Sequence, residues 1–305
     1  MTATLRSKPI DKHEVIKQLL RVLKKKYADV KPKAELPVLE SMLYSVCLEN
    51  AFPTAAEQAY QKIAATFHDL NEVRVSSIFE LELIFAGMDQ TEWRSMRLKN
   101  VLQHVFETNY SFEFESLRRK TLELATKHLN KIKGLTWFVK AYSYHEALGS
   151  HVLPVDDRML AALIWLGLAD PGTTPEHAAE ALRGAVRKAD APVFCHLVHC
   201  FANDPQHRWA FKDLESIPKV TEDETKLDTK ERLERFFSDC RAHLRAEKAA
   251  KAARKSTKHT PAAAKHAPAK HASATRKSGS SKSKAHAVPK RVAKPAPRAH
   301  GRKGR

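Results

Sequence analysis

Apolar residues recur along the chain with the period of an α-helix rather than that of a β-strand. In residues 15–27, Leu19 and Leu23 fall on one face while lysines occupy the other. Asp11 precedes this stretch and Glu14 stands three residues later, which is the form of a capping box. No run alternates apolar and polar residues with period two, and no Asn-Gly pair marks a turn between strands. The pattern predicts an all-α protein.

Most of the expected helices begin at a residue that favours helix starts. Pro53 and Pro175 occupy first-turn positions, where the missing N–H costs nothing. The predicted helices span residues 11–27, 36–51, 53–67, 76–86, 91–107, 112–131, a segment beginning at 136, 156–168, 174–189, 191–202 and 228–249.

The composition changes near the end of the chain and divides it into three parts. Of the 53 Lys and Arg residues, 18 lie after Glu247, where there is no acidic residue, and the remaining 35 balance the 35 Asp and Glu. Residues 248–305 are rich in Lys, Ala, Pro and His, and such a segment cannot bury enough surface to offset its chain entropy. We expect a leader and amphipathic helix in 1–35, a helical region in 36–247 and a disordered tail in 248–305.

The basic tail resembles the tails of linker histones. Lysine-rich segments bind DNA or RNA non-specifically because they release counterions from the phosphates. A role in solubility without any polyanion partner is the alternative. No membrane partner is expected, since no run has the length of a membrane span. We expect an intracellular protein, nucleoid-associated in the cytoplasm of a bacterium or nuclear in a eukaryote.

A tight turn at Lys133-Gly134-Leu135-Thr136 joins two predicted helices and is a candidate phosphate site. Backbone amides around a glycine at a helix N-terminus are suited to bind an anion. Further along, Val155-Asp156 places a carboxylate at the mouth of the next helix. The bland interpretation of Asp156 is an N-cap.

These two features together resemble the helix-hairpin-helix and Gly/Pro-Asp loop of the endonuclease III-like DNA glycosylase superfamily. Ile132 to Phe138 falls on the hairpin and Val155-Asp156 on the catalytic aspartate, and a weaker resemblance covers residues 42–201. The resemblance implies a helix-hairpin-helix glycosylase fold, double-stranded DNA as partner, and base excision with Asp156 as the catalytic carboxylate. It implies DNA contacts from Lys131, Lys133, Gly134, Thr136 and Lys140.

Phe138 stands where the bifunctional members of that superfamily carry the lysine that forms a Schiff base. Lys140 points to another side of the helix, so no β-lyase activity is expected. An aromatic residue at this position resembles the branch that removes alkylated bases. The implied base pocket contains Trp137, Phe138 and Tyr142, and each of these residues can equally be part of an ordinary core.

Several positions depart from the family pattern. Thr136 replaces the second hairpin glycine, and Cys47 stands in place of a glutamine that inserts into DNA. A catalytically inactive DNA-binding or chromatin-organising protein with the same fold is therefore the alternative. A third interpretation is a helical domain whose hairpin match is accidental and whose tail binds RNA.

No cofactor or metal is expected. The four cysteines lack the spacing of an iron–sulfur cluster, and the sequence gives no sign of a disulfide framework. Cys195-His196 and His199-Cys200 are a weak zinc candidate because zinc ligands usually come from separate segments. Arg94, Arg97 and Lys99 are candidates for DNA contacts or for a solvated face.

Overall fold

The protein is all-helical in the computed structural model, which describes residues 11–219, 221 and 227–257. None of the described helices is long and apolar enough to cross a membrane. The α-helices are α1 (Lys12–Lys26), α2 (Val38–Leu48), α3 (Pro53–Thr66), α4 (Leu70–Val75), α5 (Ile78–Ile84), α6 (Thr91–Asn109), α7 (Leu122–Leu129), α8 (Trp137–Glu146), α9 (Asp157–Trp165), α10 (Pro175–Arg183), α11 (Ala191–Asn203) and α13 (Thr229–Thr257), with 3-10 helices η1 (Glu115–Arg119) and η2 (Arg208–Phe211).

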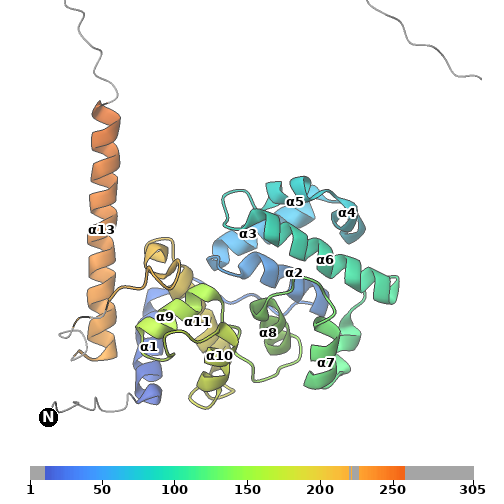
Figure 1. Ribbon diagram of the computed structural model, residues 1–305, viewed down its shortest axis with the longest axis horizontal. Helices are drawn as coiled ribbons and strands as arrows, with labels where there is room; N and C mark the ends of the chain where they lie inside the picture. The colour runs from blue at the N-terminus through green and yellow to red at the C-terminus, as the bar shows by residue number, and fades with distance from the viewer. Residues whose placement is uncertain (1–10, 220, 222–226, 258–305) are drawn as a thin grey trace, which may run out of the picture. The chain divides into compact units, whose positions relative to one another are not determined.

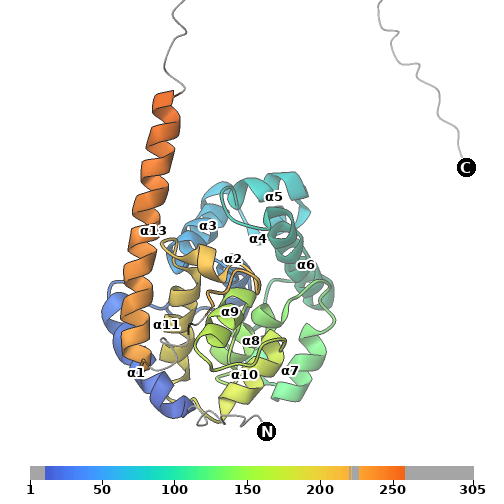
Figure 2. The same cartoon turned by 60° about the vertical axis from the view of Figure 1, so that its left-hand side comes forward.

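The helices of residues 11–255 form two groups (Figure 1). In the first, α2 packs against α3, α6 and α8, while α4 and α5 pack on α6. In the second, α1 and α9 pack on α11, so the chain enters this group first, leaves it for the other, and returns after α8. Figure 2 shows α10 beside α8 and α9, where it joins the two groups. The connection between α8 and α9 therefore passes from one group to the other.

Side-chain caps fix several of the helix starts that the sequence predicts. Thr136 and Asp156 cap α8 and α9 by accepting hydrogen bonds from the amides of Val139 and Met159. At α1, Asp11 accepts from His13, but Glu14 does not complete the capping box. The full capping box occurs instead at α5, between Ser77 and Glu80.

Some of the predicted elements differ from those in the structure. The helix expected over 112–131 is η1 followed by α7, because Lys120 is extended and Thr121 caps a new helix. The short α4 was not expected, although Asp69 caps it through the amide of Glu72 at 2.7 Å. α13 continues to residue 257, so the boundary proposed at 247/248 falls inside a helix. The remainder of the predicted tail, 258–305, lies outside the described residues.

Candidate functional site

The hairpin between α7 and α8 turns at Gly134, whose φ is +71°. A side chain there would be strained, because L-residues rarely adopt this conformation. Thr136 has a φ of −75° and needs no glycine, so the replacement of the family's second glycine leaves the turn intact. Among the described residues, the amides of Gly134, Thr136, Trp137 and Phe138 have no hydrogen-bond acceptor. The hairpin thus has several backbone donors without an internal acceptor at the start of a helix, where its dipole favours an anion.

The lysines predicted to contact DNA lie on this hairpin. Lys131 and Lys133 are exposed, and the carbonyl of Lys133 accepts a bond of 3.1 Å from Asn100. Lys140 is held by Asn130 at 2.8 Å on the flank of the turn. The hydroxyl of Thr136 is engaged inside the protein, where it caps α8 and interacts with Glu49. The exposed donors are therefore backbone amides and two lysines.

The three basic residues of α6 hold other elements of the protein. The guanidinium of Arg94, which is 2% exposed, donates to the carbonyls of Val46 and Glu49 at the end of α2. Arg97 pairs with Glu49 at 2.5 Å, and Lys99 donates to the carbonyl of Ser76 at 2.6 Å. The proposal that these residues face DNA is thus replaced by a structural role.

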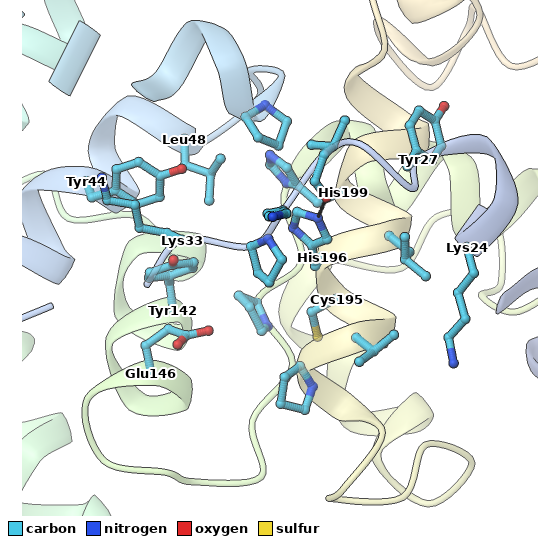
Figure 3. Close-up of a pocket in the computed structure, with 18 of the residues that line it drawn as sticks. Lys24, Tyr27, Lys33, Tyr44, Leu48, Tyr142, Glu146, Cys195, His196 and His199 are labelled. Carbon is cyan, nitrogen blue, oxygen red and sulfur yellow. Dashed lines mark hydrogen bonds between the residues drawn. The ribbon is translucent and has the colours of Figure 1, made fainter. Parts of the chain in front are cut away.

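A cavity of about 430 Å³ opens between the two groups of helices (Figure 3). Its walls come from the α1–α2 connection, α2, α8, the loop before α9, and α11. Phe138 and Tyr142 line it from α8, Tyr44 from α2 and His199 from α11. The rings of Phe138 and Tyr142 lie 6.0 Å apart, and that of Tyr44 is 6.3 Å from Tyr142. Such aromatic walls suit a flat ring.

Trp137 lies outside this cavity. It lines a second one with Lys140 and Tyr144, on the side of α8 that faces α7 and α10. Successive residues of a helix point about 100° apart, so Trp137 and Phe138 cannot both face one pocket. Of the three predicted base-pocket residues, Phe138 and Tyr142 line the same cavity, and Trp137 lines the second one.

The charged side chains that line the cavity are three lysines and one carboxyl: Lys24, Lys31, Lys33 and Glu146. The ammonium of Lys33 lies 2.8 and 2.7 Å from the two carboxylate oxygens of Glu57 and stands over the rings of Tyr44 and Tyr60. Burial raises the pKa of the Glu146 carboxyl, and the nearby charge of Glu35 raises it further. Burial also raises the pKa of the Tyr44 phenol, so this hydroxyl stays neutral near the cavity.

Asp156 is enclosed behind the cavity wall, and its side chain has no exposed surface. One oxygen accepts the amide of Met159 at 2.7 Å and the other accepts the amide of Asn50 at 3.0 Å. The Nδ1 atom of His199 lies 3.3 Å from the second oxygen, and Asn203 donates to it at 3.4 Å. Burial acts to raise the pKa of Asp156, but the hydrogen bond and charge of His199 and the two amides outweigh it, and the pKa lies below its ordinary value.

Little in the sequence indicates which residues contact Asp156. Asn50 follows α2 with a φ of +51°, a left-handed conformation that asparagine tolerates after a helix. His199 and Asn203 lie one turn apart on α11, in a stretch considered above only for zinc. His199 stacks on Phe138, with ring centroids 5.7 Å apart and an interplanar angle of 23°. Phe138, the residue at the lyase position, therefore contacts the histidine that holds Asp156.

The histidines of the zinc candidate on α11 form hydrogen bonds with backbone carbonyls. His196 shares a hydrogen bond of 2.8 Å with the carbonyl of Val30, and His199 one of 2.8 Å with the carbonyl of Ala51. Burial raises the pKa of the Cys195 thiol. Within the described part of the chain, no group of three or more His, Cys, Asp or Glu side chains is arranged to hold a metal ion.

Comparison with known proteins finds similarity in structure but not in sequence. No protein-family model and no curated protein matches the chain. Among solved structures, a non-covalent endonuclease III–DNA complex is similar over 62% of this chain and 85% of its own, with 14% identity and a TM-score of 0.48. The H. pylori 3-methyladenine DNA glycosylase bound to 1,N6-ethenoadenine is similar over 63% of this chain and 97% of its own, with 16% identity and a TM-score of 0.49.

A thermostable thymine-DNA glycosylase gives 12% identity and a TM-score of 0.44, covering 63% of this chain and 86% of its own. Two of these three proteins are named as DNA glycosylases and the other as endonuclease III. Identities of this size concern the fold alone.

Proposed function

We propose that the protein is a monofunctional DNA N-glycosylase that releases a damaged base, with alkylated purines as the first candidates. The observation that carries the proposal is the position of Phe138 in the first turn of α8. The amides before this residue have no acceptor among the described residues and suit a DNA phosphate, while its ring lines the aromatic cavity and contacts His199 beside Asp156. One helix start thus links a phosphate site, a base-sized cavity and a carboxylate.

The chemistry follows from this arrangement. A base inside a duplex must be flipped out before its bond to the sugar can be broken, and the flipped base requires a pocket with stacking partners. As the base leaves, positive charge develops on the sugar, and an ionised carboxylate held by fixed donors stabilises that charge. Asp156 is such a carboxylate, because its pKa is lowered.

A lyase step is not supported by the residues of the cavity. Schiff-base formation requires an amine that can lose its proton and attack the sugar. Phe138, at the position of the lysine in the lyase members, offers none. Of the three lysines that line the cavity, Lys33 is held by both oxygens of Glu57, while Lys24 and Lys31 come from α1 and the connection that follows it, not from α8. We therefore propose release of the free base without scission of the strand.

Alkylated purines fit the walls of the cavity. Many of them are electron-poor or cationic, and aromatic faces attract such rings. Phe138, Tyr142 and Tyr44 supply the faces, and Glu146 supplies a carboxyl at the same cavity. A cationic base would favour the ionised form of Glu146 and oppose the effect of its burial on the pKa.

The test is release of free base from duplex DNA by the full chain, with substrates that carry alkylated purines, uracil or oxidised bases. We expect a free alkylated purine, an intact abasic strand, and no release by Asp156→Asn. Asparagine retains the capping oxygen, so this variant should fold. Release by Asp156→Asn at the wild-type rate would contradict the proposed role of Asp156.

The phosphate site can be tested separately by DNA binding. Gly134→Ala strains a left-handed residue in the hairpin, and Gly172→Ala strains one with a φ of +85° elsewhere; both sites have room for the added Cβ. We expect both variants to lose about 1 kcal/mol of stability. Only Gly134→Ala should weaken binding to a short duplex, by roughly tenfold, since a single phosphate contact is affected. Equal affinities would exclude the hairpin as a DNA contact.

The enclosure of Asp156 favours a second candidate function. Its side chain has no exposed surface and donors surround both oxygens, so no water reaches the carboxylate in this conformation. A DNA-binding protein without catalysis would have this appearance. Tight, salt-dependent binding of duplex DNA with no base released from any substrate would support it. In either case, the basic residues after Glu247 would add salt-sensitive contacts to DNA or RNA.

A further inference from the structure

The imidazole of His199 lies between two groups that accept hydrogen bonds. Its Nε2 is 2.8 Å from the carbonyl oxygen of Ala51, and its Nδ1 is 3.3 Å from Oδ2 of Asp156. A carbonyl and an ionised carboxylate have no proton to give. Both ring nitrogens must therefore carry a proton when Asp156 is ionised, which makes the ring an imidazolium.

Asn203 does not alter this assignment. Its amide nitrogen lies 3.5 Å from Nδ1, but it is closer to two oxygens, at 3.1 Å from the carbonyl of His199 and 3.4 Å from Oδ2 of Asp156. The two N–H bonds of the amide satisfy these oxygens and leave none for Nδ1. The opposite orientation of the amide would place its oxygen against the carboxylate.

Other charged and titratable groups near the pair come from α2, α9 and α11. At the end of α2, Glu49 pairs with Arg97, while Arg94 binds backbone carbonyls. On α9, the pKa of Asp157 is raised by burial and by the charge of Asp156. On α11, the pKa of His196 is lowered by burial, and His199 lowers it further.

His199 is consequently the only positively charged side chain within hydrogen-bond distance of Asp156 among the described residues. Burial opposes the ionised form of an enclosed carboxylate, and a positively charged partner offsets this effect together with the N–H donors.

We propose that His199 is a positioning residue of the glycosylase: it carries a fixed positive charge that keeps Asp156 anionic and oriented inside the protein. The inference rests on the proposed function, because an anionic Asp156 is needed to stabilise the charge on the sugar. It also gives Phe138 a role. Where lyase-type relatives place a lysine on α8, this chain places a ring that stacks on His199, and the positive charge comes from α11.

The first experiment reads the protonation of His199 directly and does not depend on activity. Side-chain nitrogen NMR of the full chain, with the His199 signal assigned from His199→Gln, distinguishes an imidazolium from either neutral tautomer. We expect two protonated nitrogens at about pH 7. In Asp156→Asn, we expect the ring to have lost one proton at the same pH. A neutral His199 ring in the wild-type protein would overturn the proposal.

The second experiment is the pH dependence of base release by the full chain, with two matched variants. His199→Gln retains a donor for Ala51 but carries no charge. His207→Gln alters a buried histidine just beyond the same helix that neither lines the cavity nor contacts Asp156. In His199→Gln the acidic limb of the rate profile should move up by at least about one pH unit, equivalent to about tenfold slower release on that limb. The His207→Gln limb should stay in place.

The possible results separate the two claims. A uniform loss of rate at every pH in His199→Gln would assign His199 a merely structural role and overturn the proposal. If the wild-type protein releases no base, the proposed glycosylase fails, and the NMR result still decides whether His199 holds Asp156 as an ion pair. If His199→Gln does not fold, the response of the ring to Asp156→Asn decides, with the His199 signal assigned by elimination from His207→Gln.

Discussion

Two buried aspartate–histidine pairs lie at α11, and they differ in geometry: His199 of this helix faces Asp156 at the start of α9, and Asp204 faces His207 just beyond the end of α11. In the first, Nδ1 of His199 lies 3.3 Å from Asp156, and in the second, Nδ1 of His207 lies 3.9 Å from Asp204. In both, Nε2 of the histidine faces a backbone carbonyl, that of Ala51 at 2.8 Å or that of Phe201 at 2.7 Å. The residue types are the same, so the difference lies in what else surrounds each carboxylate.

The surroundings determine which histidine is charged. Asp204 accepts the hydroxyl of Tyr27 at 2.9 Å and the amide of Gln206 at 2.8 Å, and its distance of 3.9 Å from Nδ1 of His207 is too long for a hydrogen bond. His207 is buried in an aromatic cluster formed by the rings of Phe201, Phe211, Phe236 and Phe237. This burial lowers the pKa of His207 more than the charge of Asp204 raises it, so this ring is neutral. In these two pairs, the histidine that we infer to be charged is the one within hydrogen-bond distance of the carboxylate. The pair at the cavity meets that condition and the pair in the aromatic cluster does not.

The largest difference should come from replacing each aspartate. Asp156→Asn removes the negative charge that we propose stabilises the sugar, and we expect a loss of roughly 10²–10⁴ in the single-turnover rate of base release. Asp204→Asn retains an oxygen for Tyr27 and lies in the aromatic cluster, so its rate should stay within about threefold of the wild-type rate. Equal losses in the two variants would mean that both pairs act only through stability.

A smaller difference should appear in stability on acidification. The pKa of folded His207 lies below its ordinary value of about 6.5, so the unfolded chain binds the proton first as the pH falls. Its contribution to stability is complete above that pH and decreases below it, by at most about 1.4 kcal/mol per pH unit. His207→Gln should remove this part of the slope in urea unfolding between about pH 6.5 and 5.

The pair at the cavity should respond in a lower range. Since the pKa of Asp156 is lowered, its contribution persists until the pH falls below the ordinary aspartate value of about 4. Asp156→Asn should therefore leave the slope of urea unfolding between about pH 6.5 and 5 unchanged. A change there of the size seen in His207→Gln would contradict the assignment of the two pairs.

The ring stacked on His199 should matter more for catalysis than for folding. Phe138→Leu keeps an apolar side chain in the cavity wall but removes the stack, which is worth about 1 kcal/mol. We expect roughly tenfold slower release of a purine, with KM raised as the flipped base loses its wall. Wild-type kinetics in Phe138→Leu would show that this cavity does not hold the flipped base.

The smallest effect should come from the hydroxyl of Tyr27. Tyr27→Phe removes its hydrogen bond to Asp204, and urea unfolding should show a loss of about 1 kcal/mol. Base release should not change, because Tyr27→Phe keeps the ring that lines the cavity and removes only the hydroxyl bound to Asp204. A slower rate in this variant would couple the two pairs through α11.

Much of the helical framework could be predicted because its signals are local. Asp156 and Thr136 cap the helices that follow them, and Gly134 takes the left-handed conformation that the hairpin requires. The helix expected across 112–131 failed because two extended residues, Lys120 and Thr121, separate two short elements.

The candidate site was less predictable because its contacts join distant segments. Asn50 and His199 reach Asp156 across 106 and 43 positions of the chain, and no spacing in the sequence indicates such a contact. Arg94 is a charged residue on an amphipathic helix, yet it is buried because the end of α2 offers it carbonyls. Tertiary partners, rather than residue type, determined these roles.

The unbonded amides at the start of α8 have a consequence for hydrogen exchange. Most amides in a packed helix exchange with solvent only when the structure opens, but those of Gly134, Thr136, Trp137 and Phe138 have no internal bond to break among the described residues. They should exchange rapidly in the free protein although Phe138 itself is buried. A phosphate bound at the hairpin would slow these same positions, so the footprint of DNA on α8 can be recorded as protection at adjacent residues, whether or not a base is ever released.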